Sequence, residues 1–445
     1  MKSVLPSIIS TCQTAYVKGR FIGETGRLIS DILEITNTLN IGGFLVTVDI
    51  EKAFDSLNHN FLIATLELFN FGDNFINWIK ILLKNQESCV INGGLTSGYF
   101  KLERGARQGD PISAYIFIVA LEMVLLAITQ NQNIKGIEIF GHEYIYSSYA
   151  DDTSFSLRDE ESIRNTMQII NKFSCFSGLK PNVSKCEIAG IGILKGVHMA
   201  LCGMKCINLT KNSIKILGLH FSYDKFLQNA KNFQETMINI QRILQIWKMR
   251  QLTLEGRILI FKTLAISKIV FLASQTTIPN DMVEKLMKIQ EDFVWLGKKT
   301  KINYSTLCNS HETGGLKNID IRAKIISLQC SWVKRLFDDN FHEWKLIPKH
   351  LFERTFVIEK CFHSHFKPNA KVNLEPFPVF YINILNKWHT CSTDPIVPST
   401  IFSQYLWFNS LITISNDVIF FKRLHSKGLN YISQLFNEQN GKLKT

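Results

Sequence analysis

Short apolar runs and amphipathic stretches alternate over the first half of the chain. The run GFLVTVDI at 43–50 predicts a buried strand with an Asp at its far end. The other predicted strands are 88–92 and 98–102, a hairpin around Gly93 and Gly94, then 137–140, 144–149, 153–157, 185–191 and 214–221. The predicted helices are 58–71, 74–84, 111–130 and 160–177. This mixture predicts an α/β (α+β) core that ends near residue 222.

Two local details refine this core. Asp110 is expected to cap the helix 111–130, with Pro111 at its first position. Strands 137–140 and 144–149 are expected to pair with 153–157, which leaves Asp151 and Asp152 in the turn before the last of them.

From residue 224 the period becomes helical. The predicted helices are 225–247, 254–272, 282–295 and 316–337. The pattern weakens after residue 340, and residues 345–445 are aromatic and basic without recognisable chemistry. A helical region therefore follows the α/β core.

Composition and charge narrow the class of protein. Of 445 residues, 46% are hydrophobic and 20% charged, which excludes disordered, collagen-like and coiled-coil chains. The net charge is +12, but residues 1–153 carry 11 Lys and Arg against 16 Asp and Glu, and residues 154–445 carry 39 against 22. A basic region of this size favours a polyanionic partner such as nucleic acid, although a solvated basic surface would give the same count.

The apolar runs and cysteines bear on location. The runs 112–128 and 258–273 are interrupted by charged residues, and the first ten residues lack the apolar stretch of a signal peptide. The ten cysteines are scattered like thiols in a reducing compartment. We expect no membrane span and an intracellular protein of the nucleus, the cytoplasm or both, not a secreted one.

Three carboxylates hold the most informative positions. If the strands around Asp151 and Asp152 lie beside the strand that ends at Asp49, the three side chains converge. Like charges so close need a cation, and hard oxygen ligands suit Mg²⁺. The alternatives are an ordinary Asp-Asp turn and an Asp that caps a helix.

Five motifs around these acids resemble those of reverse transcriptases, in the family's order. They are VDIEKAFDS at 48–56 (motif A), RQGDP at 107–111 (motif B), YADD at 149–152 (motif C), GLKPN at 178–182 with Lys185 (motif D) and ILGL at 216–219 (motif E). The segment QTAYVKGR at 13–20, with WLG at 295–297 and GGL at 314–316, resembles the polymerases of non-LTR, LINE-type retrotransposons.

The resemblance implies a palm-type polymerase core, an antiparallel sheet with packed helices. It is followed by a helical thumb and a mostly helical C-terminal region. The expected segments are 1–42, a remnant of the fingers; 43–222, the palm; 223–297, the thumb; and 298–445, of no assigned role. Compared with full LINE-type enzymes the chain is expected to be N-terminally truncated, without upstream finger motifs, endonuclease or Cys/His knuckle.

The resemblance also implies RNA-directed DNA synthesis with an RNA template, a DNA primer and dNTPs. Two Mg²⁺ ions, or Mn²⁺ in their place, are the implied cofactors. The resemblance leaves the oligomeric state open. The implied metal ligands are Asp49, Asp151, Asp152 and the carbonyl of Ile50, with Lys185 as the acid for pyrophosphate. Phe54 is the implied gate against a 2′-hydroxyl; Gln108 and Gly109 line the new base pair, and Leu217 and Gly218 form the primer grip. Arg107, Arg242, Lys248, Arg250 and Arg257 are the implied nucleic-acid contacts.

Each assignment has a plainer alternative. Phe54 can be an ordinary core ring, Lys185 a surface lysine, and the basic residues a solvated face. The chain as a whole can be an inactive remnant that only binds nucleic acid, because the fingers are expected to be missing. An RNA-dependent RNA polymerase and a group II intron maturase share the palm; Phe54 and the YADD box argue against the first, and the segments at 295–297 and 314–316 against the second.

Overall fold

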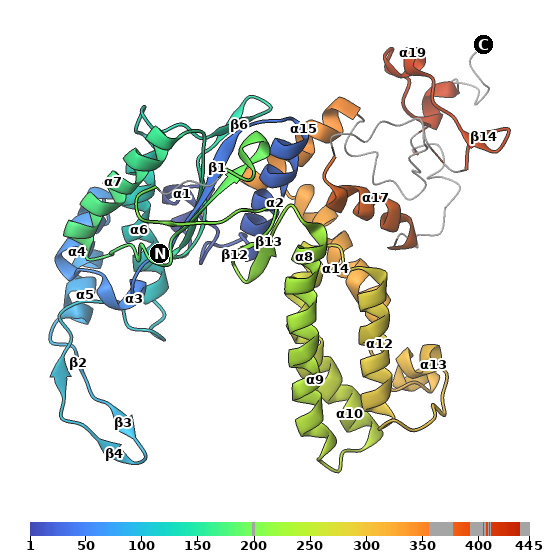
Figure 1. The fold of residues 1–445 in the computed structure, drawn as a ribbon, viewed down its shortest axis with the longest axis horizontal. Helices are drawn as coiled ribbons and strands as arrows, with labels where there is room; N and C mark the ends of the chain where they lie inside the picture. Colours follow the sequence, from blue (N-terminus) through green and yellow to red (C-terminus); the bar gives the residue numbers. More distant parts are fainter. Residues whose placement is uncertain are drawn as a thin grey trace. The chain divides into compact units, whose positions relative to one another are not determined.

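The computed structural model describes residues 1–197, 201–355, 377–391, 404, 406–407, 409 and 411–436. The chain divides into two compact units (Figure 1). The first is Met1–Gln228 with Asn340–Trp344, and the second is Asn229–Asp339 with Lys345–Thr445. The finer division into four functional segments stays a prediction, and the two units are described separately.

A five-stranded sheet forms the centre of the first unit. Its order is β11 (Lys205–Cys206), β10 (Glu187–Ile191), β1 (Gly43–Val48), β9 (Asp152–Leu157) and β8 (Tyr146–Tyr149). The central strand β1 pairs antiparallel with both β9 and β10, as expected. The edge pair β10–β11 is parallel, so the sheet is mixed rather than purely antiparallel.

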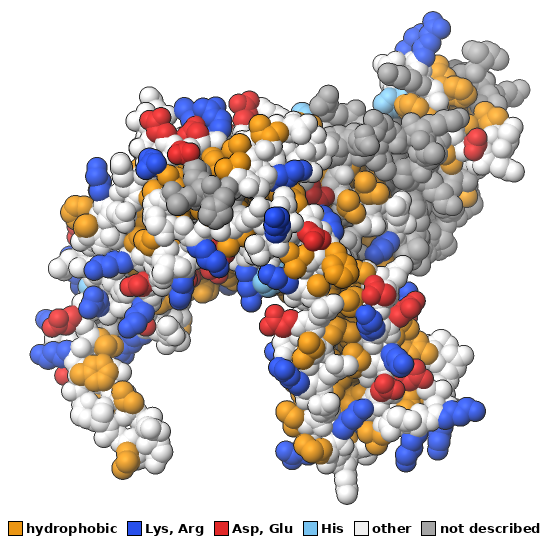
Figure 2. Space-filling view, viewed as in Figure 1, with side chains coloured by type: hydrophobic (Ala, Val, Ile, Leu, Met, Phe, Trp, Pro, Cys, Tyr) orange, Lys and Arg blue, Asp and Glu red, His pale blue; other side chains and the backbone are white. Residues whose placement is uncertain are grey.

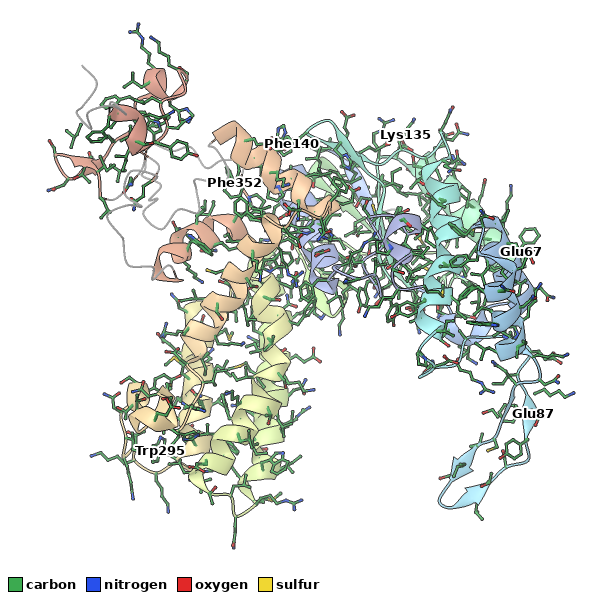
Figure 3. The ribbon with its side chains drawn as sticks, turned by 180° about the vertical axis from the view of Figure 1, so that it is seen from behind. Glu67, Glu87, Lys135, Phe140, Trp295 and Phe352 are labelled. Atoms are coloured by element: carbon green, nitrogen blue, oxygen red, sulfur yellow. The ribbon has the colours of Figure 1, made fainter. Side chains whose placement is uncertain are left out.

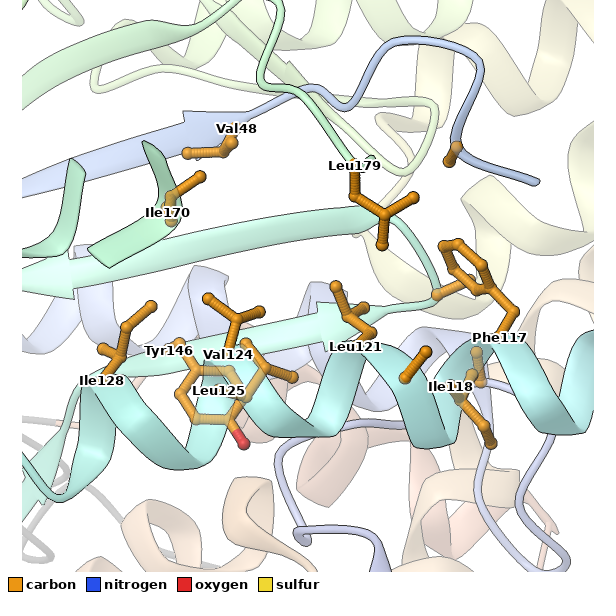
Figure 4. Close-up of a cluster of buried hydrophobic side chains, with 14 of the residues drawn as sticks. Val48, Phe117, Ile118, Leu121, Val124, Leu125, Ile128, Tyr146, Ile170 and Leu179 are labelled. Atoms are coloured by element: carbon orange, nitrogen blue, oxygen red, sulfur yellow. The ribbon is translucent and has the colours of Figure 1, made fainter. Parts of the chain in front are cut away.

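Helices cover the sheet because its strands are apolar on both faces. Alternation along β1 directs Val46 and Val48 to one face and Leu45 to the other, and all three are buried. Helices α4 (His59–Leu68), α6 (Ser113–Thr129) and α7 (Glu160–Ser177) form one core with Val46 and Val48 (Figure 4). Helix α2 (Ile22–Thr38) packs against β8 and β10. This buried layer holds the ends of β1 and β9 in place.

Helix α7 has the bounds that its sequence predicts. The Asp159 side chain accepts a hydrogen bond from the Ser162 amide at 2.8 Å and so caps the first turn. The helix ends at Gly178, whose φ is +78° and whose Cα lies so close to the Ser56 carbonyl that a Cβ would collide with it. Both ends are therefore local features that the sequence carries.

Other predicted elements are confirmed with small shifts. Asn58 caps α4 by accepting from the Phe61 amide. The glycine-centred hairpin is an arm of two short ladders, in which Glu87 lies near the base (Figure 3). The remaining elements before α6 are α1 (Leu5–Ile8), α3 (Ala53–Ser56), α5 (Asp73–Leu83), β2 (Glu87–Ser88), β3 (Ile91–Asn92), β4 (Leu95–Thr96) and β5 (Phe100–Lys101).

Two predictions around α6 and the hairpins are wrong. The helix begins at Ser113, since the Asp110 carboxylate accepts from the Ile112 amide at 3.0 Å and closes a turn before the helix instead of capping it. Strand β6 (Ile137–Ile139) pairs with β7 (His142–Tyr144), so of the two strands predicted to pair with β9 only β8 does so. The chain reverses at Gly141, whose φ is +77°. This turn brings β7 beside β6, so β6 pairs with β7 and not with β9.

The predicted strand 214–221 is a hairpin of β12 (Ile214–Ile216) and β13 (Leu219–Phe221). Its two-residue turn has positive φ at both Leu217 (+51°) and Gly218 (+79°), the backbone that matches the twist of paired strands. A Leu in this conformation is uncommon, so the turn is not visible in the sequence pattern. The first unit also contains the 3₁₀ turn η1 (Gly192–Leu194).

A short return segment, Asn340–Trp344, belongs to the first unit although it follows most of the second in sequence. The Glu343 carboxylate lies 2.8 Å from His142 Nε2 and accepts from the Thr11 hydroxyl at 3.0 Å. His342 Nδ1 lies 3.1 Å from a carboxylate oxygen of buried Glu24. The sequence pattern did not predict this docking, which depends on pairs of residues far apart in the chain.

The second unit is helical, as predicted, and Trp295 lies at the end of one of its helices (Figure 3). Phe261, Phe293 and Ile240 are fully buried at its core. The helix α8 (Lys225–Asn229) joins the two units, and the turn η5 (Glu343–Lys345) crosses their second boundary, since Glu343 and Trp344 belong to the first unit. The other elements of the second unit are η2 (Ala230–Gln234), α9 (Glu235–Lys248), α10 (Leu254–Ile260), η3 (Phe261–Ala265), α11 (Ser267–Gln275), α12 (Asn280–Val294), α13 (Tyr304–Cys308), η4 (His311–Thr313), α14 (Ile321–Leu336), α15 (Leu346–Thr355), α17 (Val379–Cys391), β14 (Thr413–Ile414), β15 (Asp417–Val418), α19 (Lys422–His425) and η6 (Ile432–Leu435). The π-helical segments η2 and η3 interrupt helices that were expected to be continuous.

Among the residues that the structure describes, no single helix has both the length and the apolar character needed to cross a membrane. The bent pair Leu254–Ala265 and Ser267–Gln275 meets that criterion only when the two parts are taken together.

Candidate active site

The three predicted carboxylates lie at one end of the central sheet. Asp49 directly follows β1, Asp151 lies between β8 and β9, and Asp152 begins β9. The register pairs Val48 with Thr153 in antiparallel strands. Asp49, which follows Val48, and Asp152, which precedes Thr153, therefore lie at the same end of the sheet. The convergence inferred from the sequence therefore results from the β1–β9 pairing.

The carboxylates are close enough to affect one another's protonation. Burial raises the pKa of Asp151 above its ordinary value, and the negative charge of Asp49 raises it further. Burial also raises the pKa of Asp152, together with the charges of Asp151 and Asp49. This end of the sheet thus holds negative charge at an energetic cost, which a bound cation would relieve.

The arrangement fits a cation with few protein ligands rather than a preformed cage. In the described part of the chain, no three His, Cys, Asp or Glu side chains are grouped as metal ligands would be. Mg²⁺ is commonly held by one or two carboxylates, with water and substrate phosphates as the other ligands, and Asp49 and Asp151 suit that coordination.

The segment after α7 runs beside the residues that follow β1. The Asn182 amide donates to the Asp49 carbonyl at 2.7 Å, and the Glu51 amide donates to the Lys180 carbonyl at 2.9 Å. Ile50 forms a bridge with Pro181. These contacts place Lys185 Nζ 3.7 Å from Asp49 Oδ2, with two thirds of the lysine side chain still exposed.

Phe54 lies beside the loop that carries Gln108 and Gly109. The Ala106 amide donates to the Phe54 carbonyl at 2.7 Å. The half-buried Phe54 ring stacks on Phe117 of α6, with ring centroids 4.3 Å apart. Gln108 and Gly109 are exposed, and Gly109 has a φ of +94°, which explains the glycine there. Residues from the predicted motifs A and B are thus brought together.

The other predicted contacts lie elsewhere. Leu217 and Gly218 form the turn of the separate β12–β13 sheet. Arg107 is exposed and donates to the Glu87 carbonyl at 3.3 Å. The remaining four basic residues belong to the second unit, where Lys and Arg side chains are interspersed with acidic ones (Figure 2): Arg242, Lys248 and Arg250 are exposed, and half-buried Arg257 donates to the Leu252 carbonyl.

The segment 13–20 resembles the family, but the sequence predicts no role for its individual residues. The centroid of the Tyr16 ring lies 6.4 Å from that of Tyr149, which is two residues before Asp151 in the chain. Burial raises the pKa of Tyr16, and the nearby Tyr149 and Asp151 raise it further. Gln13 contacts the same turn. The only sequence signal for either residue is their place in a segment that resembles the family.

The raised pKa of Asp151 predicts that replacing it stabilises the metal-free protein. A group whose pKa is raised on folding opposes folding when it is charged, and this cost disappears as the pH falls through the folded-state pKa. In EDTA at pH 7 we expect Asp151→Asn to have a higher Tm than the parent, with a difference that shrinks toward acid pH. A thermal melt of both proteins across this pH range checks the prediction, and a lower Tm for the variant at pH 7 would contradict it.

Comparison with known families gives this site its context. The family model of reverse transcriptases (RNA-dependent DNA polymerases) matches residues 2–221, which include all three carboxylates, Phe54 and Lys185. Residues 2–221, just under half of the chain, therefore belong to the reverse transcriptase family.

Its relatives narrow the group to non-LTR retrotransposons, which confirms the LINE-type resemblance. The transposon TX1 uncharacterized 149 kDa protein of Xenopus laevis is 26% identical over 410 residues, or 88% of this chain and 30% of that protein. The Pol polyprotein of the type-2 retrotransposable element R2DM of Drosophila melanogaster is 24% identical over 33% of this chain and 14% of its own length. An R2 Pol polyprotein of Popillia japonica is 24% identical over 42% of this chain and 25% of its own. The chain thus spans less than a third of each of these relatives.

Solved structures of telomerase are also similar. Apo telomerase of Candida tropicalis matches with a TM-score of 0.38 and 14% identity, over 78% of this chain and 59% of that one. Telomerase of Candida albicans, solved with a fragment of telomeric RNA, matches with a TM-score of 0.37 and 12% identity, over 75% and 53%.

Proposed function

We propose that this chain carries out RNA-directed DNA synthesis, in which a primer 3′-hydroxyl attacks the α-phosphate of a dNTP and pyrophosphate leaves. The observation that carries the proposal is the placement of Asp49 and Asp151 at one end of the sheet, close enough that the charge of one raises the pKa of the other. Such a pair favours a divalent cation between protein and triphosphate. The family membership of residues 2–221 supports the same reaction.

The metal site of this proposal uses the chain's oxygen atoms. Asp49 and Asp151 would hold two Mg²⁺ ions, or Mn²⁺ in their place, with Asp152 and the Ile50 carbonyl as further ligands. When bound, such ions favour ionisation of an attacking hydroxyl and offset charge that develops on phosphate oxygens. Asp152 would have the smaller share in holding the ions, because its ligand role in the family motif is the less certain one.

The residues around the carboxylates would select the nucleotide. The Phe54 ring would occupy the space that a ribose 2′-hydroxyl needs, and its stack on Phe117 limits how far it can turn aside. Gly109, which has no side chain and a positive φ, would let the backbone approach the new base pair. Gln108 lies beside it and is exposed to such a partner.

Lys185 would protonate the leaving pyrophosphate. Its ammonium group lies 3.7 Å from Asp49 Oδ2, so it reaches the carboxylate end of the sheet, and its exposed side chain can move to an incoming phosphate. We expect Lys185→Met to lower kcat by about 10²-fold, the lower end of the range for general acids, with little change in KM for dNTP. Single-turnover incorporation measures this, with exposed Lys180→Met as the control. A rise in KM at unchanged kcat would assign Lys185 to binding instead.

Nucleic acid would be held by the other residues that the family resemblance implies. The turn at Leu217 and Gly218 would support the primer end, as a primer grip. Arg107, Arg242, Lys248, Arg250 and Arg257 would contact phosphates, with the helices of the second unit acting as a thumb. Phosphate contacts of this kind add affinity without sequence preference and weaken as salt rises.

The alternative function is nucleic-acid binding without catalysis. A primed RNA template with dNTPs and Mg²⁺ separates the two, if the parent is compared with the variant Asp151→Ala/Asp152→Ala for both incorporation and template binding. The proposal predicts incorporation by the parent, none by the variant, and binding by both. Binding without incorporation by the parent would favour the alternative, and equal incorporation by both proteins would exclude the carboxylates as the source of activity.

A further inference from the structure

Gln13 lies at the edge of the sheet, against the strand that leads to Asp151. Its neighbours bond to β8 through the backbone: the Ser148 amide donates to the Cys12 carbonyl at 2.9 Å, and the Thr14 amide donates to the Ser148 carbonyl at 2.9 Å. The Gln13 side chain is completely buried. A polar side chain in such a place needs hydrogen-bond partners, and these partners show what it does.

Both ends of the Gln13 amide bond to the turn before Asp151. Oε1 accepts from the Ala150 amide at 2.9 Å and from the Ala15 amide at 3.0 Å. Nε2 donates to the Ser148 hydroxyl at 3.0 Å and to the Ala150 carbonyl at 3.3 Å. One side chain thus contacts both backbone polar groups of Ala150, the residue directly before the carboxylate.

Ala150 needs such support because its backbone is strained. Its φ is +54°, in the left-handed region, which is unfavourable for a residue that has a Cβ. A strained backbone conformation is retained only where several contacts with the surrounding structure hold it in place. The Ser148 hydroxyl, which also donates to the Ala150 carbonyl at 3.0 Å, adds to the bonds from Gln13.

Gln13 is itself held by a partly buried network that contains two charged side chains, Arg20 and Glu122. The Arg20 guanidinium donates to the carbonyls of Gln13 and Ser10, each at 2.6 Å, and to that of Ile9 at 3.0 Å. The Glu122 carboxylate of α6 is buried and accepts from the amide and hydroxyl of Ser10. The segment is therefore tied to α6, in the same core that supports the sheet.

We propose that Gln13 is a positioning residue that fixes the backbone of Ala150 and thereby the direction of the Asp151 carboxylate toward its metal ion. The inference rests on the proposed function for its catalytic consequence. It assigns a role to the segment 13–20, which contributes no ligand: Arg20 sets the position of Gln13, and Gln13 sets the turn.

Two variants and a matched control test this role. Gln13→Met keeps the length of the side chain and removes all four hydrogen bonds, whereas Gln13→Glu keeps the acceptor for the Ala15 and Ala150 amides. Gln290→Met is the control, since Gln290 is also buried and bonds to Asn318, Ile319 and Tyr304 in the second unit. Thermal melts identify any variant that fails to fold.

Hydrogen exchange of the Ala150 amide in metal-free protein measures the turn directly. We expect Gln13→Met to speed this exchange by about tenfold or more, since a buried hydrogen bond is lost, with a smaller change in Gln13→Glu and none in Gln290→Met. Unchanged exchange in Gln13→Met would overturn the proposal. This measurement requires no catalysis, so it decides the positioning role even if the proposed function fails.

Mn²⁺ binding, followed by the electron paramagnetic resonance of the free ion, measures the consequence. Residues that orient metal ligands typically affect affinity by about 10–100-fold, and we expect a loss in that range for Gln13→Met but not for Gln290→Met. Incorporation should lose kcat with little change in KM for the primed template. Equal Mn²⁺ affinity in the two Met variants would overturn the inference, whereas a parent that has a protected turn and binds Mn²⁺ but does not polymerise would overturn only the proposed function.

Discussion

Replacing Asp151 by Asn is expected to lower the rate of dNTP incorporation by about 10³-fold while the fold is retained. Asn has the shape of Asp but no charge, and the loss of one of two carboxylates leaves the site unable to hold its cations against the triphosphate. The same change removes the charge that opposes folding in the metal-free protein. The variant should therefore be less active and more stable, and single-turnover incorporation together with thermal melts measures both effects.

Two further variants show whether the loss is specific. Asp152→Asn should lose only about tenfold, since Asp152 is assigned the smaller share in holding the ions. Glu138→Gln removes an exposed acid on β6 and should behave like the parent. Incorporation by Asp151→Asn at the parent's rate would contradict the assignment of this carboxylate, whatever the other two variants do.

Replacing Phe54 by Ala is expected to raise the use of rNTP relative to dNTP by about 10²-fold. A pocket that excludes one hydroxyl by shape alone discriminates by roughly this factor. The kcat/KM for dNTP should fall less than that for rNTP rises, because the ring excludes a group that dNTP lacks. Steady-state incorporation of matched rNTP and dNTP pairs measures the ratio, and Phe54→Tyr should retain the discrimination.

The alternative for Phe54 is a purely structural ring, since it stacks on Phe117. Phe61→Ala is the matched control: Phe61 is a partly buried ring of α4 that packs edge-on against Phe173. If both variants lose stability and neither changes the rNTP to dNTP ratio, Phe54 is a core residue and the gate assignment is wrong.

Local signals in the sequence were sufficient for much of the fold. Helix α7 has the predicted bounds because Asp159 and Gly178 terminate it through contacts within a few residues. The strand β1 is a continuous apolar run, as expected for a strand at the centre of a sheet that is buried on both faces. The proximity of Asp49 and Asp151 could be predicted because the strands next to both acids were expected to lie side by side.

Contacts between distant residues were outside the reach of such patterns. Gln13 and Ala150 are 137 positions apart, and the sequence around neither residue predicts the hydrogen bonds between them. The turn at Leu217 has a backbone conformation that Leu rarely adopts, so the sequence pattern predicts one strand where the hairpin β12–β13 forms. The return of Asn340–Trp344 to the first unit likewise depends on pairs such as His142 with Glu343.

The most direct test of the account is single-nucleotide addition to a labelled DNA primer on an RNA template by the purified parent chain, with each dNTP supplied alone. The account predicts that only the dNTP complementary to the template is added, that addition requires Mg²⁺ or Mn²⁺, and that Asp151→Asn slows it by about 10³-fold. Tight binding of the primed template with no addition of any dNTP, in either metal, would contradict it and leave a protein that binds nucleic acid without copying it.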